Sequence, residues 1–231
     1  MRVIARKLRE DIEDAEENKA DVRREDKTLG RFTIPFQDFP NAIVTLTSVG
    51  ILKNHKPTHF PVDIELRKGQ RLLIEGPNGI GKSTLLEKLA RGSYEGAKIH
   101  PDIKVGYYRQ DFSGLDFNKT VREALEEVAT DLTNETIFRT AARFLIPSEL
   151  LKNKVGSLSE GQKGLLCFAR FTLQQPGLLI LDEPTNHINF RHIPVIAQAI
   201  EDYDGAVILV SHVPDFVEQI KFTETLDLGK L

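Results

Sequence analysis

The stretch "RLLIEGPNGIGKST", residues 71–84, decides which fold this chain adopts. It opens with a continuous apolar run, as strands buried in a parallel sheet do. A glycine-rich turn follows, and Lys82, Ser83 and Thr84 then begin a helical stretch. The order satisfies G-x-x-x-x-G-K-[ST] between a strand and a helix, which is the setting that this motif requires. The sequence therefore predicts a loop that binds phosphate.

Each residue type in this loop has a chemical role. Glycines let the backbone fold into a nest whose N–H groups converge on phosphate, and the helix N-terminus adds its dipole. Lys82 is expected to reach the β- and γ-phosphates of a nucleotide, and the Ser83 hydroxyl to ligate Mg²⁺. The predicted nucleotide-binding set is Gly76, Pro77, Asn78, Gly79, Ile80, Gly81, Lys82, Ser83 and Thr84.

The rest of the chain alternates apolar, β-type runs with helical stretches. The expected strands are residues 43–46, 62–66, 71–75, 104–108, 177–182 and 205–210. The expected helices are residues 82–91, 120–129, 159–173 and 191–200, and capping-box pairs open two of them, Thr120 with Glu123 and Ser159 with Gln162. Such alternation predicts an α/β fold with a mainly parallel sheet and flanking helices.

Two adjacent carboxylates end the apolar run at residues 178–182. A phosphate-bound Mg²⁺ needs an acidic residue at the end of a neighbouring strand, and Asp182 stands at such a place. Hydrolysis also needs a group that orients or deprotonates a water, and Glu183, one residue later, leaves the strand toward the cleft. We therefore expect Asp182 to contribute to the metal site and Glu183 to act as the general base.

Composition is typical of a globular, water-soluble domain with room for an appendage. The chain has 231 residues, of which 40% are hydrophobic and 28% charged. A net charge of −3 gives no overall attraction for nucleic acid, although a local basic patch is compatible with it. The single cysteine, Cys167, suits a reducing, cytoplasmic compartment. No apolar run approaches the roughly 18 residues of a membrane helix, so stable membrane insertion is not expected.

Residues 1–31 differ in character from the rest. Between Arg2 and Arg31 there are nine Lys/Arg and nine Asp/Glu, and no proline. An exposed, charged helical arm is expected here, either a solvated tail or the end of a longer linker helix. The remaining residues, 32–231, are expected to form the nucleotide-binding domain, with a mostly helical insert between about residues 113 and 164.

Taken together, four motifs in order resemble those of the ATP-binding cassette (ABC) family. Besides the phosphate loop, "YYRQDF" (107–112) supplies Gln110, "SLSEGQK" (157–163) is similar to the family's signature motif, and "ILVSHVPDF" (208–216) supplies His212. The resemblance covers about residues 43–220. It implies a P-loop ATPase fold of the ABC type, with a small antiparallel β subdomain and a helical subdomain.

The resemblance also implies roles for these residues. Gln110 would sense Mg²⁺ and the γ-phosphate, so it joins Ser83 and Asp182 in the expected metal site. His212 would hold the γ-phosphate and the attacking water, beside Glu183. The signature would press on a nucleotide held by another cassette, through Leu158, Ser159, Glu160, Gly161 and Gln162. ATP and Mg²⁺ are the implied cofactors, and a second cassette is the implied partner.

The residues that follow the two carboxylates resemble those of one group within this family. "DEPTNHIN" (182–189) is similar to the "DEPTNHLD" of the ABC-F group, whose members join two cassettes by a charged helical linker and mostly act on ribosomes. The chain thus resembles a second cassette of that group, as a fragment or a half-size protein. An ATPase that pairs with the first cassette of its parent, or with its own copy, and works with the ribosome in translation is expected. The alternative is the ATPase subunit of a membrane transporter, which the charged arm and the "TNH" tripeptide disfavour.

Several positions depart from the family pattern, among them Leu165, where arginine is common, and three that bear on the nucleotide site. Glu160 stands where the signature usually has glycine, and Asn189 replaces an aspartate that usually contacts the partner cassette. No aromatic residue lies in 48–54, where one normally stacks on adenine, so Ile51 is the expected apolar contact for the base.

Overall fold

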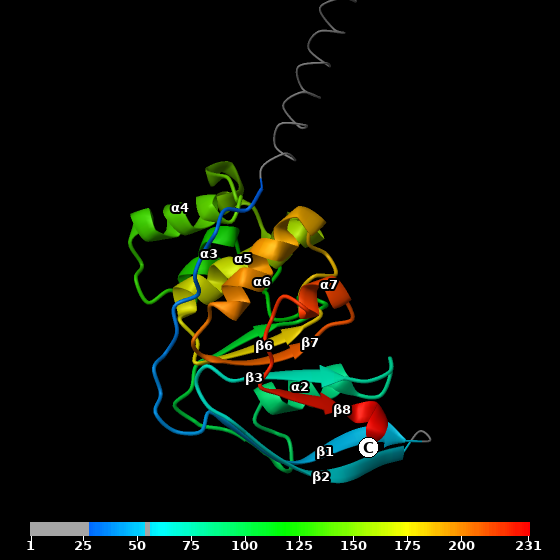
Figure 1. Ribbon diagram of the computed structural model, residues 1–231. Coiled ribbons are helices and arrows are strands. Elements are labelled where there is room, and N and C mark those ends of the chain that lie inside the picture. The colour runs from blue at the N-terminus through cyan, green and yellow to red at the C-terminus, as the bar shows by residue number, and fades with distance from the viewer. Residues whose placement is uncertain (1–27, 54–55) are drawn as a thin grey trace, which may run out of the picture.

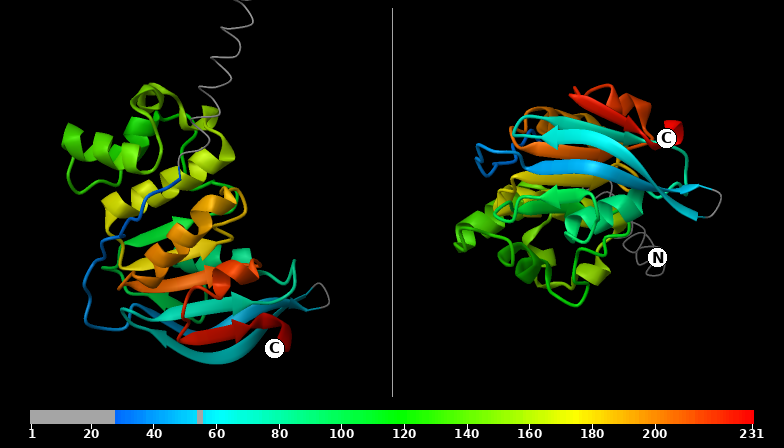
Figure 2. Two further views of the ribbon diagram at one scale, coloured as in Figure 1. Left: turned by 45° about the horizontal axis from the view of Figure 1, so that its top comes forward. Right: turned by 90° about the horizontal axis from the view of Figure 1, so that it is seen from below.

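The computed structural model describes residues 28–53 and 56–231, so nearly all of the expected arm at residues 1–31 lies outside the described residues. The elements stack in layers (Figure 1; Figure 2). Helices α3–α6 lie on one face of a central sheet, and α2 and a smaller sheet lie on the other. This arrangement confirms the expected α/β class with its small antiparallel sheet and its helical part.

The central sheet is parallel throughout and has the strand order β5-β6-β7-β3-β8. Its strands are β5 (Val105–Tyr108), β6 (Leu178–Asp182), β7 (Ala206–Val210), β3 (Arg71–Glu75) and β8 (Glu224–Asp227). Every residue of β6 and β7 is buried, because helices or strands cover both faces of these central strands. Four of the five strands were expected from their apolar runs, and the mixed run of β8 was not.

The smaller sheet is antiparallel, with the order β2-β1-β4. It consists of β1 (Val44–Lys53), β2 (Lys56–Leu66) and β4 (Ala97–Ile99). Here β1 and β2 form a far longer hairpin than the expected strands at 43–46 and 62–66. Strand β2 contains proline, but it is an edge strand, and Pro61 lies opposite Ser48, beside a register shift between Leu46 and Ser48. Edge strands and bulges are the places where a sheet tolerates proline.

The helices flank the central sheet. They are α2 (Lys82–Ala90), α3 (Val121–Glu126), α4 (Asn134–Arg143), α5 (Glu160–Gln174), α6 (Ile193–Glu201) and α7 (Pro214–Val217), with 3₁₀ turns η1 (Ser148–Lys152), η2 (Val155–Ser157), η3 (Phe190–His192) and η4 (Leu228–Lys230). Both expected capping boxes are formed, one before α3 and one before α5. Within the described chain no residue of 119–150 joins the central sheet, which agrees with a mostly helical insert.

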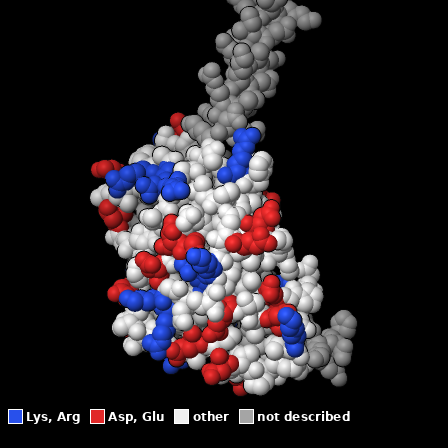
Figure 3. Space-filling model, in the orientation of Figure 1, with Lys and Arg blue, Asp and Glu red and all other residues white. Residues whose placement is uncertain are grey.

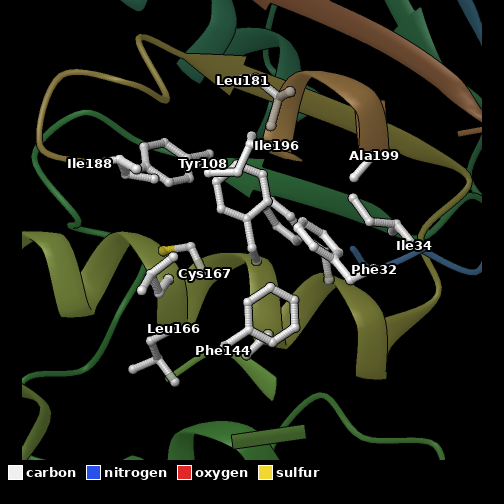
Figure 4. Packing of buried hydrophobic residues seen from close by; sticks show 14 of the residues in the cluster. Phe32, Ile34, Tyr108, Phe144, Leu166, Cys167, Leu181, Ile188, Ile196 and Ala199 are labelled. Atoms are coloured by element: carbon white, nitrogen blue, oxygen red, sulfur yellow. The ribbon is translucent and has the colours of Figure 1, made fainter. Parts of the chain in front are cut away.

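Two apolar cores lie on the two faces of the central sheet. The lower core packs α2 and the small sheet against one face. In the upper core, helices α3–α6 pack against the other face, around the ring of Phe168, which contacts Tyr108 and Phe171. Figure 4 shows part of the upper core, where Phe32 and Ile34 from the start of the described chain lie among residues of the helices. A segment far from these helices in sequence therefore completes their core.

That segment, residues 29–37, is extended and is called the strap from here on. Alternate strap residues Phe32 and Ile34 are buried, while Thr33 and Pro35 are exposed. The strap runs along the outside of the layers from the helices toward the small sheet (Figure 1). At its start, the Leu29 N–H donates to His192 Nδ1 at 3.2 Å, so packing onto the domain begins inside the expected arm. The strap therefore binds both the helical part and the turn before α6.

Candidate functional site

The phosphate loop connects the end of β3 to the start of α2. Gly76, Gly79 and Gly81 all have positive φ angles, of 141°, 80° and 110°. L-residues with side chains rarely adopt such angles, so only glycine allows this path without strain. At Gly76 there is a second reason, because an added Cβ would lie 3.3 Å from Leu228 Cβ and 3.4 Å from the Gly229 nitrogen. The sequence thus encodes the loop's conformation locally.

The start of α2 is left open to an anion. In the described chain no side chain caps this helix, and its first turn carries no acidic residue. The Lys82 side chain is buried, and its ammonium donates to the carbonyls of Gly76 at 2.7 Å and Pro77 at 3.2 Å. The cation is therefore held inside the curve of the loop. Free N–H groups, the helix dipole and one cation converge there, which is the arrangement that binds phosphate.

The end of β6 places a buried carboxylate beside the loop. Asp182 is 3% exposed, and its Oδ1 has no hydrogen-bond partner among the described residues. Burial raises the pKa of this carboxyl, and the Ser83 hydroxyl and the charge of Lys82 oppose the rise. An unsatisfied buried carboxylate oxygen beside a hydroxyl fits Mg²⁺, which prefers oxygen ligands and usually takes one or two carboxylates together with phosphates and waters.

Within residues 28–53 and 56–231, no group of three or more His, Cys, Asp or Glu could hold a metal ion. Ser83 and Asp182 would hold Mg²⁺ together with nucleotide phosphates, because Mg²⁺ is usually bound by one or two carboxylates and by substrate phosphates. Gln110 is exposed and lines the cavity around the phosphate loop, as Ser83 and Asp182 do. All three expected metal-site residues thus lie close to one another.

Glu183 and His212 meet at the carboxyl ends of β6 and β7. The His212 backbone N–H donates to Glu183 Oε2 at 3.2 Å, and His212 Nε2 lies 3.5 Å from Glu183 Oε1. Burial raises the pKa of the Glu183 carboxyl, while the His212 N–H and the His212 side chain oppose the rise. Glu183 also has a positive φ of 50°, a conformation that costs a non-glycine residue about 1–3 kcal/mol and gathers at functional sites.

One cavity of about 430 Å³ gathers these groups. Its lining includes Asn78, Gly79, Gly81, Lys82, Ser83, Thr84, Gln110, Asp182, Glu183, Asn186 and His212. Gln110, Glu183 and His212, which are expected to act on water and the γ-phosphate, therefore line the same cavity as the phosphate loop. Asn186 was missed as a site residue, because an asparagine in a turn has no distinguishing chemistry in sequence.

Unlike those residues, the signature segment lies elsewhere. None of the described residues Leu158–Gln162 lines the phosphate-loop cavity, although Glu160 borders a neighbouring hollow with Gln110 and Asp182. Ser159 caps α5, and its N–H donates to Gln162 Oε1 at 3.0 Å. Gly161 packs tightly, since an added Cβ would lie 3.1 Å from the His187 carbonyl. The signature therefore does not line the phosphate-loop cavity, but Glu160 shares the neighbouring hollow with Ser83.

The three departures from the family pattern have different outcomes. Glu160 Oε2 lies 3.0 Å from His187 Nδ1 of the same chain. Asn189 caps the turn η3 through its side chain, which accepts from the Arg191 N–H at 3.0 Å. The expectation for Ile51 is wrong: this side chain is 4% exposed and belongs to the lower core, so it does not line the phosphate-loop cavity.

A network beside Gln110 was also missed. The Arg109 guanidinium lies 3.2 Å from Glu87 on α2, 3.4 Å from the Ser113 hydroxyl and 4.6 Å from the centre of the Tyr107 ring. It ties the segment around Gln110 to the helix that follows the phosphate loop. Arginine and glutamate at positions 109 and 87 carry no sequence pattern that links them, so only the fold reveals this pair.

Comparisons with known proteins agree with this geometry. Residues 60–186 match the family model described as ABC transporter. ATP-binding cassette sub-family F member 3 of Mus musculus is 33% identical over 205 residues, which are 86% of this chain and 29% of that protein. ABC transporter F family member 5 of Arabidopsis thaliana is 37% identical over 185 residues, 78% of this chain and 27% of that protein.

A solved dimeric ATP-binding cassette with bound ADP and Pi is similar in fold, with a TM-score of 0.61 and 20% identity over 80% of this chain and 95% of that one. The chain spans less than a third of the length of the two curated relatives. In the part of the chain that the structure describes, no helix is long and apolar enough to cross a membrane. The loop, the paired carboxylates and the matched family model lead to one conclusion: this chain is a member of the ABC transporter family, an ATP-binding cassette similar to members of sub-family F.

Proposed function

We propose that this chain binds ATP with Mg²⁺ and hydrolyses it, with Glu183 as the general base. The observation that carries the proposal is the contact between Glu183 and His212 in the cavity that the phosphate loop lines. A carboxyl with a raised pKa is a better proton acceptor near neutral pH than an ordinary glutamate. Its position one residue after Asp182 brings it to the side of the γ-phosphate.

The other residues divide the remaining work. Lys82 leaves the loop carbonyls to contact the β- and γ-phosphates, and the loop N–H groups hold the same oxygens. Ser83, Asp182 and Gln110 would hold Mg²⁺, which would neutralise charge on the phosphates. His212 orients the attacking water and the γ-phosphate beside Glu183.

Pairing with a second cassette completes the site in this proposal. Because none of the residues Leu158–Gln162 lines the phosphate-loop cavity of its own chain, we assign them to a nucleotide held by another cassette. The partner is the first cassette of a longer parent protein or a second copy in a head-to-tail pair. An isolated cassette would then bind ATP and hydrolyse it slowly.

The proposed setting is ribosome-associated work in translation, in the cytoplasm. Similarity to sub-family F members supports it, as does the charged composition of residues 1–31, which suits a linker helix. We propose that this arm precedes a cassette at 32–231 whose helical subdomain spans about residues 113–164. Sedimentation of the full-length parent with ribosomes, with and without ATP, tests the setting. Co-purification with an integral membrane protein instead would favour a transporter subunit.

Glu183→Gln tests the catalytic assignment. The amide keeps the shape of the side chain but accepts no proton, so turnover is expected to fall by about two to four orders of magnitude while ATP binding persists. Glu218→Gln is the matched control, because this glutamate follows directly after α7, is exposed and does not line the cavity. Binding of a fluorescent ATP analogue and phosphate release are measured for both variants. Hydrolysis by Glu183→Gln at the parent rate would show that another group is the base.

A further inference from the structure

A hollow of about 390 Å³ lies on the helical part of the molecule, away from the phosphate loop. The strap forms one wall with Thr33 and Pro35, α4 forms another, and Thr172 and Leu173 of α5 lie between them. It is called the strap hollow from here on. None of its lining residues belongs to the ATP site, so the proposed hydrolysis leaves the hollow unexplained.

Polar donors line the strap hollow from two of the three segments, because the Thr172 hydroxyl of α5 already donates to the Ala169 carbonyl. Helix α4 contributes Arg139, Arg143 and Thr140, and the strap contributes Thr33. Within the described chain the hydroxyls of Thr33 and Thr140 and the guanidinium of Arg143 have no hydrogen-bond or ion-pair partner. Arg139 pairs with Glu135 at 3.2 Å, with side chains that are 64% and 83% exposed, and it also interacts electrostatically with Asp131. Such an exposed pair holds its arginine weakly, so both guanidiniums are available to a ligand.

The charge of this region contrasts with the whole chain. The chain carries a net charge of −3, yet Lys and Arg side chains gather in a patch over the region of α4 (Figure 3). The acidic neighbours are Glu135 and Asp131, and Asp131 already accepts hydrogen bonds from Thr133 and Thr136. Arg31 is exposed on the same face of the strap as Thr33, since alternate residues of an extended chain share a face. The hollow therefore offers an anion two cationic side chains on the α4 wall and hydroxyl groups on both the α4 wall and the strap wall.

The shape of the donor set indicates which anion fits. Arg139 and Arg143 lie one helical turn apart, with their Cβ atoms about 5–6 Å from each other, so they present two guanidiniums in a row. A row of cations matches a chain of phosphates better than a single phosphate group. Among the described residues no aromatic side chain lines the hollow, so these residues offer phosphate contacts without a platform for stacking bases.

We propose that the strap hollow binds the phosphate backbone of an RNA strand, independently of its base sequence. Arg139 and Arg143 contact successive phosphates, and the hydroxyls of Thr33 and Thr140 donate to phosphate oxygens. The choice of RNA as the source of phosphates rests on the proposed association with ribosomes, whereas the phosphate chemistry rests on the hollow alone. The contact would hold the strap and α4 against RNA while the ATP site works elsewhere on the molecule.

The test is the salt dependence of RNA binding by the full chain. Affinity for a labelled single-stranded oligouridylate is measured by fluorescence anisotropy between about 50 and 200 mM salt. Each phosphate contact to a single strand contributes about 0.7 to the slope of log K against log salt. Arg139→Ala/Arg143→Ala is therefore expected to lower that slope by about 1.4 and to weaken binding at low salt. Thr140→Val, which keeps the side-chain shape, is expected to weaken binding by about two- to tenfold with an unchanged slope.

Matched controls separate this site from general charge and from misfolding. Arg67→Ala/Lys68→Ala removes two exposed cations next to β2 that do not line the strap hollow, and should leave the slope unchanged. Circular dichroism and binding of a fluorescent ATP analogue should be unaltered in every variant, because none touches the ATP site. Sedimentation with ribosomes is measured separately, so loss of ribosome association with intact RNA binding would contradict only the proposed function.

Two results would overturn the inference. One is a slope for Arg139→Ala/Arg143→Ala equal to that of the parent chain or of the Arg67→Ala/Lys68→Ala control, including the case in which no chain binds RNA. The other is displacement of RNA by inorganic phosphate at the same concentration of phosphate groups. That displacement would show that the hollow binds single phosphates and not a strand.

Discussion

Replacing Phe32 with alanine is expected to lower the free energy of unfolding by about 3–5 kcal/mol. Phe32 is 6% exposed, although it lies in a segment without helix or strand. Its ring packs edge-on against Phe144 with centroids 4.7 Å apart, and against Phe168 at 6.2 Å. Truncation to alanine removes a buried ring from between two helices, and the helices cannot close the gap without losing their contacts with the sheet.

A second substitution separates apolar burial from ring contact. Phe32→Leu keeps most of the buried apolar volume but loses the edge-on contacts, each worth about 0.5–1.5 kcal/mol. Its effect should therefore be clearly smaller than that of Phe32→Ala. Phe190→Ala is the matched control, because the same side chain is 74% exposed there and its truncation should change stability by about 0.5 kcal/mol or less.

Urea unfolding, monitored by far-ultraviolet circular dichroism because the chain has no tryptophan, measures these differences. The expected order of stability is parent and Phe190→Ala together, then Phe32→Leu, then Phe32→Ala. Equal midpoints for Phe32→Ala and Phe190→Ala would refute the reasoning. They would show that the strap contributes nothing to the upper core and only passes over it.

Two further predictions concern the ATP site and the strap. Lys82→Ala removes the cation inside the phosphate loop, so the affinity for a fluorescent ATP analogue should fall while circular dichroism stays unchanged; undiminished affinity would contradict the assigned role. Burial, helped by the charge of Arg191, lowers the pKa of His192 below its usual 6.5, and Nδ1 accepts from the Leu29 N–H, so the folded state favours the neutral ring. This contribution to the free energy of unfolding is present above pH 6.5 and is lost as the pH falls through the lower, folded-state pKa. His192→Asn should therefore lose less stability than the parent between pH 7.5 and 5.5, measured by urea unfolding, and equal losses would count against this role for the histidine.

The sequence by itself determined the elements whose structure is local. Positive φ angles in the phosphate loop follow from its glycines, and the buried strands β3, β6 and β7 follow from continuous apolar runs. The capping boxes before α3 and α5 follow from residues three apart. In each case the interaction that decides the structure joins neighbours in the chain, so a pattern in sequence is enough to predict it.

Only the tertiary structure decided which distant residues meet. Glu183 and His212 come together because β6 and β7 are adjacent in the strand order, and Leu29 reaches His192 because the strap crosses the helices. The same holds for Ile51, which turns into the lower core because of the register of the β1–β2 hairpin. Apolar burial decides which elements pack against one another. It depends on the area that each element covers on the element opposite, which no local pattern specifies.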